Sequence, residues 1–139
     1  MNRTEIKRTN WVVYVTALLA GLIFTAYAFY ETANPGTGYD AGQSRFGFSA
    51  SETIMYSLIS LFFVVLLIFL WKRIAPYHIA ALTFVSSVLL HNLIHSLTIG
   101  WVGLAAMMIL FLGVLLTLGM VIFNFFVYRR LKKQVLVSE

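Results

Sequence analysis

Four long apolar runs, separated by short polar segments, constrain this chain more than any other feature of its sequence. They cover about residues 11–30, 52–71, 76–97 and 104–128. A helix of about 20 residues rises about 30 Å, which matches the hydrocarbon thickness of a bilayer. Because a spanning helix satisfies its own backbone hydrogen bonds, the sequence predicts an all-α integral membrane protein with four transmembrane helices.

The composition and the charges agree with this class. Hydrophobic residues make up 60% of the 139 residues and charged residues 11%, whereas about one quarter of a soluble domain is charged. The formal net charge is +5, but the basic residues flank the apolar runs, which is the pattern of membrane topology. We therefore expect contact with the lipid bilayer and no nucleic-acid binding. The chain contains no cysteine, which excludes disulfides, thiol chemistry and thiolate-ligated metals.

The segments between the runs carry turn and capping signals. The longest loop covers residues 31–51 and is rich in glycine, and residues 49–52 (Ser-Ala-Ser-Glu) fit a capping box that starts the second helix. Asn10 is placed to cap the first helix, and Pro76 suits the first turn of the third. The last connection is very short, so the third and fourth helices should be antiparallel neighbours.

Lysine and arginine predict the orientation. They gather in the N-terminal leader, in the turn after the second run and in the C-terminal tail, whereas residues 31–51 contain one arginine. Since cytoplasmic segments carry the excess of basic residues, we expect both termini in the cytoplasm and residues 31–51 outside. Alternating spans joined by short turns then give one domain, residues 1–139, with an up-down-up-down bundle.

Small residues recur at helical spacing in two of the runs, and small residues let helix backbones approach closely in lipid. They are Ala17, Gly21 and Thr25 in the first run and Ala106, Gly113 and Thr117 in the fourth. We interpret both ridges as sites of ordinary helix contact.

The third run carries a polar stripe in otherwise apolar surroundings. Its members lie three or four residues apart and share one side of a helix. They are Thr83, Ser87, His91, His95 and Thr98. Polar groups inside so apolar a segment should face protein, water or a ligand rather than lipid, so we expect this side to face the bundle.

His91 and His95 are the candidate site within this stripe. Their spacing of four residues projects both imidazoles to the same side, about 6 Å apart, which suits one metal ion. Glu31 or Glu52, at the outer ends of the first and second runs, could supply a third ligand. The alternatives are a structural role in hydrogen bonding, proton handling and ligation of haem.

Haem held by two histidines needs ligands from two helices. His78, His91 and His95 all lie in the third run, so such a haem would require a second chain. His78 and Asn124 lie at similar depth near the inner ends of the third and fourth runs, and we expect both to make interhelical polar contacts. No Asp, Glu, Lys or Arg lies inside a run, which disfavours an ion-coupled carrier.

A short segment of the chain resembles a family signature. His91-Asn92-Leu93-Ile94-His95, followed by Gly100, Gly103, Leu104 and Ala105, is similar to the His-Asn-x-x-His and Gly-x-x-Gly-Leu-Ala pattern of small bacterial four-span membrane proteins of unknown function. Here the first glycine comes one residue later, and the histidines fall in the third span rather than the second. The resemblance implies the four-span class and the cytoplasmic membrane of a prokaryote, and it implies no activity.

Three functions remain open at this point. The first is a non-catalytic accessory or assembly subunit that acts through helix contacts with other membrane subunits or with a second copy. The second is a metal-, haem- or quinone-associated redox subunit that uses His91 and His95. The third is a small carrier or pore that needs oligomerisation, since one bundle of this size leaves little room for a pathway. No catalytic motif is present, so the sequence favours a protein that is not an enzyme and has no cofactor.

Overall fold

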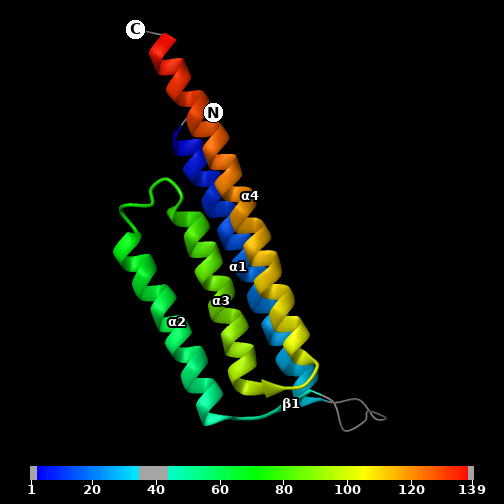
Figure 1. The fold of residues 1–139 in the computed structure, drawn as a ribbon. Coiled ribbons are helices and arrows are strands. Elements are labelled where there is room, and N and C mark those ends of the chain that lie inside the picture. The colour runs from blue at the N-terminus through cyan, green and yellow to red at the C-terminus, as the bar shows by residue number, and fades with distance from the viewer. Residues whose placement is uncertain (1–2, 35–43, 138–139) are drawn as a thin grey trace.

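The computed structural model describes residues 3–34 and 44–137, the last five of these without their side chains. Four helices make up nearly all of it, and each is long and apolar enough to cross a membrane. They are α1 (Arg3–Ala33), α2 (Ala50–Leu70), α3 (His78–Leu97) and α4 (Val102–Val137). They pack as a bundle in which neighbours in sequence run in opposite directions (Figure 1). The predicted all-α, four-span membrane fold is therefore confirmed.

The helix α3 occupies the centre of the bundle. It packs against α1, α2 and α4, whereas α2 packs chiefly against α3. Accordingly α3 contains many buried residues, and α2 contains none. Figure 1 shows α2 on one side of α3, with α1 and α4 on the other. The bundle is thus three closely packed helices with a fourth attached along one side.

The helix α1 extends beyond the apolar run from which it was predicted. The helix α1 begins at Arg3, with Glu5 in its first turn, where a carboxylate interacts favourably with the helix dipole. The predicted role of Asn10 as an N-cap is therefore wrong, because Asn10 lies inside α1 and is 3% exposed. Its side chain instead donates a hydrogen bond to Asn124 of α4.

The boundaries of α2 and α3 also differ in detail from the prediction. Ser49 is the N-cap residue of α2, but it makes no capping hydrogen bond with its side chain. Its hydroxyl lies 3.2 Å from that of Ser51, so the predicted capping box is not formed. The helix α3 begins at His78. Pro76 lies in the preceding turn rather than in the first turn of α3, because the chain between the helices closes with its own backbone hydrogen bonds, including one from Tyr77 to the carbonyl of Ile74.

A two-stranded ribbon joins the two connections at the end of the bundle away from the termini. Its strands are β1 (Arg45–Phe46) and β2 (Thr98–Ile99), paired antiparallel. Gly47 follows β1 directly against the side chain of Ile99, where a Cβ atom would collide. Gly100 follows β2 with φ 104°, a backbone conformation that favours glycine. The sequence predicted only a loop at residues 31–51, and residues 35–43 of that loop lie outside the described part.

The small-residue ridges lie against α3. A Cβ atom on Gly21 would fall 2.7 Å from Cδ1 of Leu90, and one on Gly113 would collide with the side chain of Ser87. Thr117 adds a hydrogen bond of 3.3 Å to the carbonyl oxygen of Ala80. The helices α1 and α4 therefore approach α3 closely at these positions, as the spacing predicted.

Buried apolar side chains form two clusters at different depths. The cluster near the ribbon contains Ala28, Leu90, Ile94, Val102, Ala106 and Ile109. The cluster toward the termini contains Ile79, Ala80 and Met120. The first cluster joins α1, α3 and α4 through buried residues. The second joins α3 to α4, and Val13 and Tyr14 of α1 pack against it.

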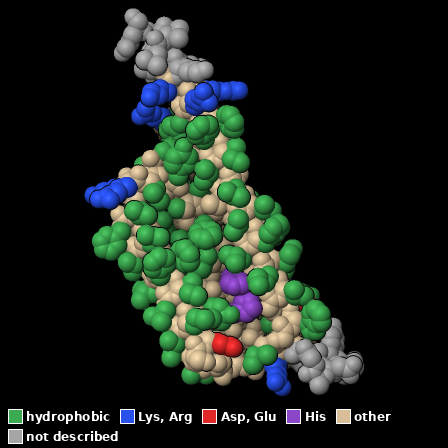
Figure 2. All heavy atoms as spheres, viewed as in Figure 1, with side chains coloured by type: hydrophobic (Ala, Val, Ile, Leu, Met, Phe, Trp, Pro, Cys, Tyr) green, Lys and Arg blue, Asp and Glu red, His purple; other side chains and the backbone are tan. Residues whose placement is uncertain are grey.

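The surface separates charge from apolar area along the length of the bundle. Figure 2 shows hydrophobic side chains over most of the visible face and basic side chains toward the end where both termini lie. Among the described residues, Arg45 of β1 is the basic residue at the opposite end. The apolar band is the surface that a bilayer would cover.

Candidate functional site

The two candidate histidines lie in the last two turns of α3, and their rings touch. The ring centroids of His91 and His95 are 4.6 Å apart at an interplanar angle of 61°. The ring of His95 also stacks on Tyr56 of α2, with centroids 5.6 Å apart and planes at 28°. On its other side, Cε1 of His95 would lie 3.2 Å from a Cβ atom on Gly103 of α4. The imidazole of His95 is therefore held between α2 and α4.

The histidine site is reachable from one face of the bundle. Figure 2 shows the histidines at the surface among apolar side chains, with an acidic side chain close by. Both rings are half-buried. The site thus lies where α2 and α4 leave part of α3 uncovered.

Two ring nitrogens of this site have no hydrogen-bond partner among the described residues. They are Nδ1 of His91 and Nε2 of His95, and both atoms are buried. Buried polar atoms in proteins are nearly always paired with protein or with water. Hence the pair has the capacity to bind water, an ion or a polar group of a ligand.

The two carboxylates that could supply a third metal ligand differ in their surroundings. Glu52, at the start of α2, lies close enough to interact electrostatically with His95. Glu31, at the end of α1, accepts a hydrogen bond of 2.6 Å from Tyr27. Among the described residues, no three His, Asp or Glu side chains are close enough to hold one metal ion. A metal at the histidine pair would need further ligands from water or from another chain.

The rest of the polar stripe lies along α4 and is satisfied within α3. Thr83, Ser87 and Thr98 each donate a hydrogen bond to the carbonyl oxygen one turn earlier, at 2.5 to 3.0 Å. Thr83 also contacts Sδ of Met120 at 3.6 Å, and Ser87 lies against Gly113. These hydroxyls therefore support helix packing and leave the histidines as the members of the stripe with unpaired polar atoms.

Asn92 is a contact residue that the sequence reasoning missed. Its amide donates hydrogen bonds to Oγ of Ser60 at 2.9 Å and to the carbonyl oxygen of Tyr56 at 3.3 Å. Thr53 of α2 adds a hydrogen bond to the carbonyl oxygen of Ser96. These bonds position α2, and with it the ring of Tyr56, beside His95. A polar residue between the two histidines was the available signal.

The polar residues near the termini differ in their contacts. Asn124 makes the expected interhelical contact, and its partner is Asn10 of α1 at 2.8 Å. His78 instead lies against Trp71, with ring centroids 4.8 Å apart. His78 is thus separate from the histidine pair and takes no part in the candidate site.

Comparison with protein-family models, with characterised proteins and with solved structures finds no match to this chain. The assignment to the class of membrane proteins therefore depends on the four helices of the chain, which are long and apolar enough to span a membrane.

Proposed function

We propose that this small polytopic membrane protein is an accessory or assembly subunit that acts through helix contacts with other membrane proteins. The observation that carries this proposal is a groove beside α2 whose mostly apolar lining also includes hydroxyl and amide groups. The helix α2 contains no buried residue, so most of its surface is available to lipid or to a partner.

The groove lies between α2 and α3 and has a volume of about 400 Å³. Its polar lining comes from Tyr56, Ser57 and Ser60 on α2 and from Asn92 and Ser96 on α3. Ser57 is exposed and lies about 10 Å of helix rise from the start of α2. Lipid tails offer no partner for such a hydroxyl, whereas a helix of another subunit does. The groove therefore suits a partner helix better than it suits lipid.

The test is crosslinking in native membranes with a photoreactive amino acid at position 57. We expect one discrete protein adduct, because Ser57 would lie in the interface. The control places the same amino acid at position 23, since Ile23 of α1 is 71% exposed and should crosslink to lipid. Identical products at both positions would contradict the proposal.

A second candidate function is metal, haem or quinone binding at His91 and His95, in a redox subunit. The unpaired ring nitrogens in the site favour it. Because metal ligation needs both imidazoles, His91→Gln should abolish the binding of zinc or copper to purified protein, while His78→Gln should leave it unchanged. Binding of metal that is equal in both variants would rule out this site, and a haem absorption band would indicate a second chain that supplies the other ligand.

A further inference from the structure

An elongated cavity lies inside the bundle, between α1, α3 and α4. Its volume is about 250 Å³, and its lining runs from Tyr14 to Phe24 on α1, from Thr83 to Leu90 on α3 and from Met108 to Leu116 on α4. Ten residues of helix rise about 15 Å, so the cavity is a slot parallel to the helices. For comparison, an apolar cavity of about 150 Å³ accommodates a benzene molecule.

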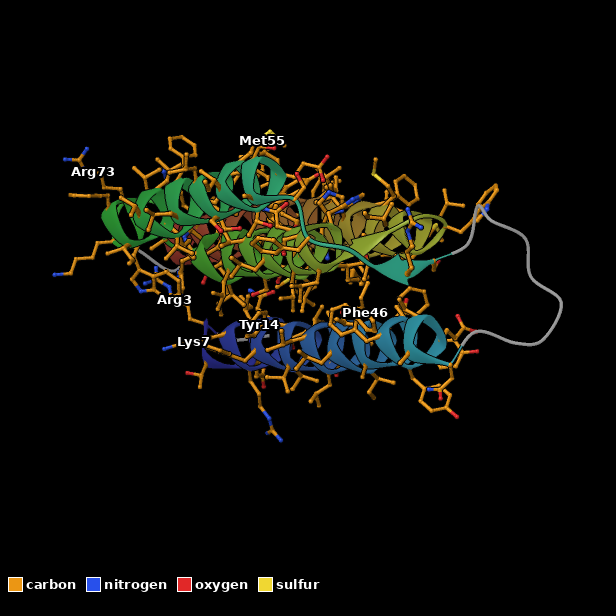
Figure 3. The ribbon with its side chains drawn as sticks, turned by 90° about the horizontal axis from the view of Figure 1, so that it is seen from below. Arg3, Lys7, Tyr14, Phe46, Met55 and Arg73 are labelled. Atoms are coloured by element: carbon orange, nitrogen blue, oxygen red, sulfur yellow. The ribbon has the colours of Figure 1, made fainter. Side chains whose placement is uncertain are left out.

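The slot is polar toward the termini and apolar toward the ribbon. Its hydroxyl groups come from Tyr14, Thr83, Ser86 and Ser87. Thr83 and Ser87 donate to carbonyl oxygens of α3, but Tyr14 and Ser86 bond to each other at 3.3 Å. Only one hydroxyl of that pair can donate to the other, so the second O–H is available to an acceptor in the slot. Figure 3 shows Tyr14 on the side of α1 that faces the other helices.

The slot opens toward lipid. Ala20 and Phe24 of α1 and Met108 and Leu112 of α4 line it and are also exposed. An empty apolar space forfeits dispersion contacts with its walls, and water inside it would find few partners. A molecule from the hydrocarbon region can enter from this side and restore the lost contacts.

We propose that this slot binds one acyl chain of a membrane lipid, with the carbonyl oxygen of the chain accepting a hydrogen bond from the Tyr14–Ser86 pair. The position of the pair supports this assignment. Tyr14 lies one helical turn from Trp11 and about 9 Å of helix rise from Arg8. Tryptophan and basic residues mark the interface where lipid headgroups lie. A chain whose carbonyl lies near that interface would extend its apolar part along the slot. A phospholipid and a free fatty acid share this chemistry.

The test is photolabelling of the full chain in vesicles with two probes, a phospholipid and a free fatty acid, each with a diazirine near the end of its acyl chain. We expect labelled peptides from the parts of α1 and α4 that line the slot. Ala20→Phe places a ring at the mouth of the slot and should abolish this labelling. Ala26→Phe is the control, because Ala26 is also exposed on α1 but does not line the slot.

Tyr14→Phe tests the proposed hydrogen bond to the carbonyl oxygen of the acyl chain, separately from the packing of the chain in the slot. Loss of one hydrogen bond in a membrane should weaken binding about three- to tenfold, and Tyr30→Phe, at an exposed position of α1, should have no effect. Labelling by the phospholipid probe alone, or by the fatty acid alone, identifies the source of the chain. Labelling that is uniform over all exposed helix faces, or equal in the two alanine variants, would overturn the proposal.

Discussion

At the scale of single residues, Gly113 of α4 lies closely against Ser87 of α3. A methyl group at position 113 would collide with the Ser87 side chain, whereas a methyl group at Gly119 would meet nothing within 4 Å. Both glycines lie in α4. A change to alanine raises helix propensity at both positions but causes a collision only at Gly113, so comparing the two variants distinguishes packing from propensity.

Gly113→Ala should therefore destabilise the bundle by about 1 to 3 kcal/mol, the usual cost of overpacking. Gly119→Ala should be neutral or stabilising, because alanine is the better helix former. Unfolding in mixed detergent measures both. Ser87→Gly in the Gly113→Ala background should restore stability, and failure of this rescue would show that the collision is not the cause.

The buried pair Asn10 and Asn124 supports a second prediction. The two side chains are 3% and 0% exposed and share one hydrogen bond. Asn10→Leu and Asn124→Leu should each cost about 0.6 to 2 kcal/mol. The double variant should cost less than the sum, because both changes remove the same bond. Asn34→Leu, at the exposed residue that follows α1, is the control, and strict additivity would contradict a direct bond.

The candidate site was partly predictable at this scale. Helical spacing is local, so the sequence could place His91 and His95 on one side of a helix, and their rings do touch. The partners are not local. Asn10 and Asn124 are 114 residues apart in sequence, and which face of α1 meets α4 depends on how both helices rotate in the bundle. For the same reason, whether the histidine pair binds a metal stays a prediction.

At the scale of elements, α2 is the helix with the fewest attachments. Among the described residues, the amide of Asn92 and the hydroxyl of Thr53 donate the hydrogen bonds between α2 and α3. The rings of Phe63 and Phe84 add an edge contact at 5.4 Å. A helix that packs against one neighbour, as α2 packs against α3, can separate from the bundle more readily than a helix that packs against two.

We expect Asn92→Leu to loosen α2 without unfolding the rest. Because the chain contains no cysteine, Thr53→Cys and Ser96→Cys introduce one disulfide pair between α2 and α3. In the presence of Asn92→Leu, this disulfide should form more slowly, and Asn34→Leu should leave its rate unchanged. An unchanged rate in the Asn92 variant would mean that apolar contacts alone position α2.

Element boundaries were less predictable than the elements themselves. The apolar runs predicted four helices because each is long, but strands of two residues, such as β1 and β2, have no periodic pattern to detect. The start of α3 at His78 depends on backbone hydrogen bonds in the preceding turn. Likewise, the extension of α1 to Arg3 crosses polar residues that the apolar pattern excludes.

At the scale of the whole molecule, the two ends of the bundle differ in charge. The termini and the connection between α2 and α3 lie at one end (Figure 1), and that end carries the described basic residues other than Arg45. Cytoplasmic segments carry the excess of lysine and arginine, so we predict that this end is cytoplasmic. A reporter fused after Glu139 should behave as internal, and a tag inserted at Gly38 should be accessible from outside. An external reporter at Glu139 would reverse the orientation.

The central position of α3 has a consequence for biosynthesis. The ribosome delivers the helices in sequence order, so α1 and α2 enter the membrane while α3 is still being made. Although these two spans are consecutive in the chain, each of them packs mainly against elements that follow α2. Until His78 and the residues after it arrive, the described parts of the first two spans lack the helix of this chain against which both of them pack. A nascent chain arrested before His78 should therefore contain two inserted spans that do not associate.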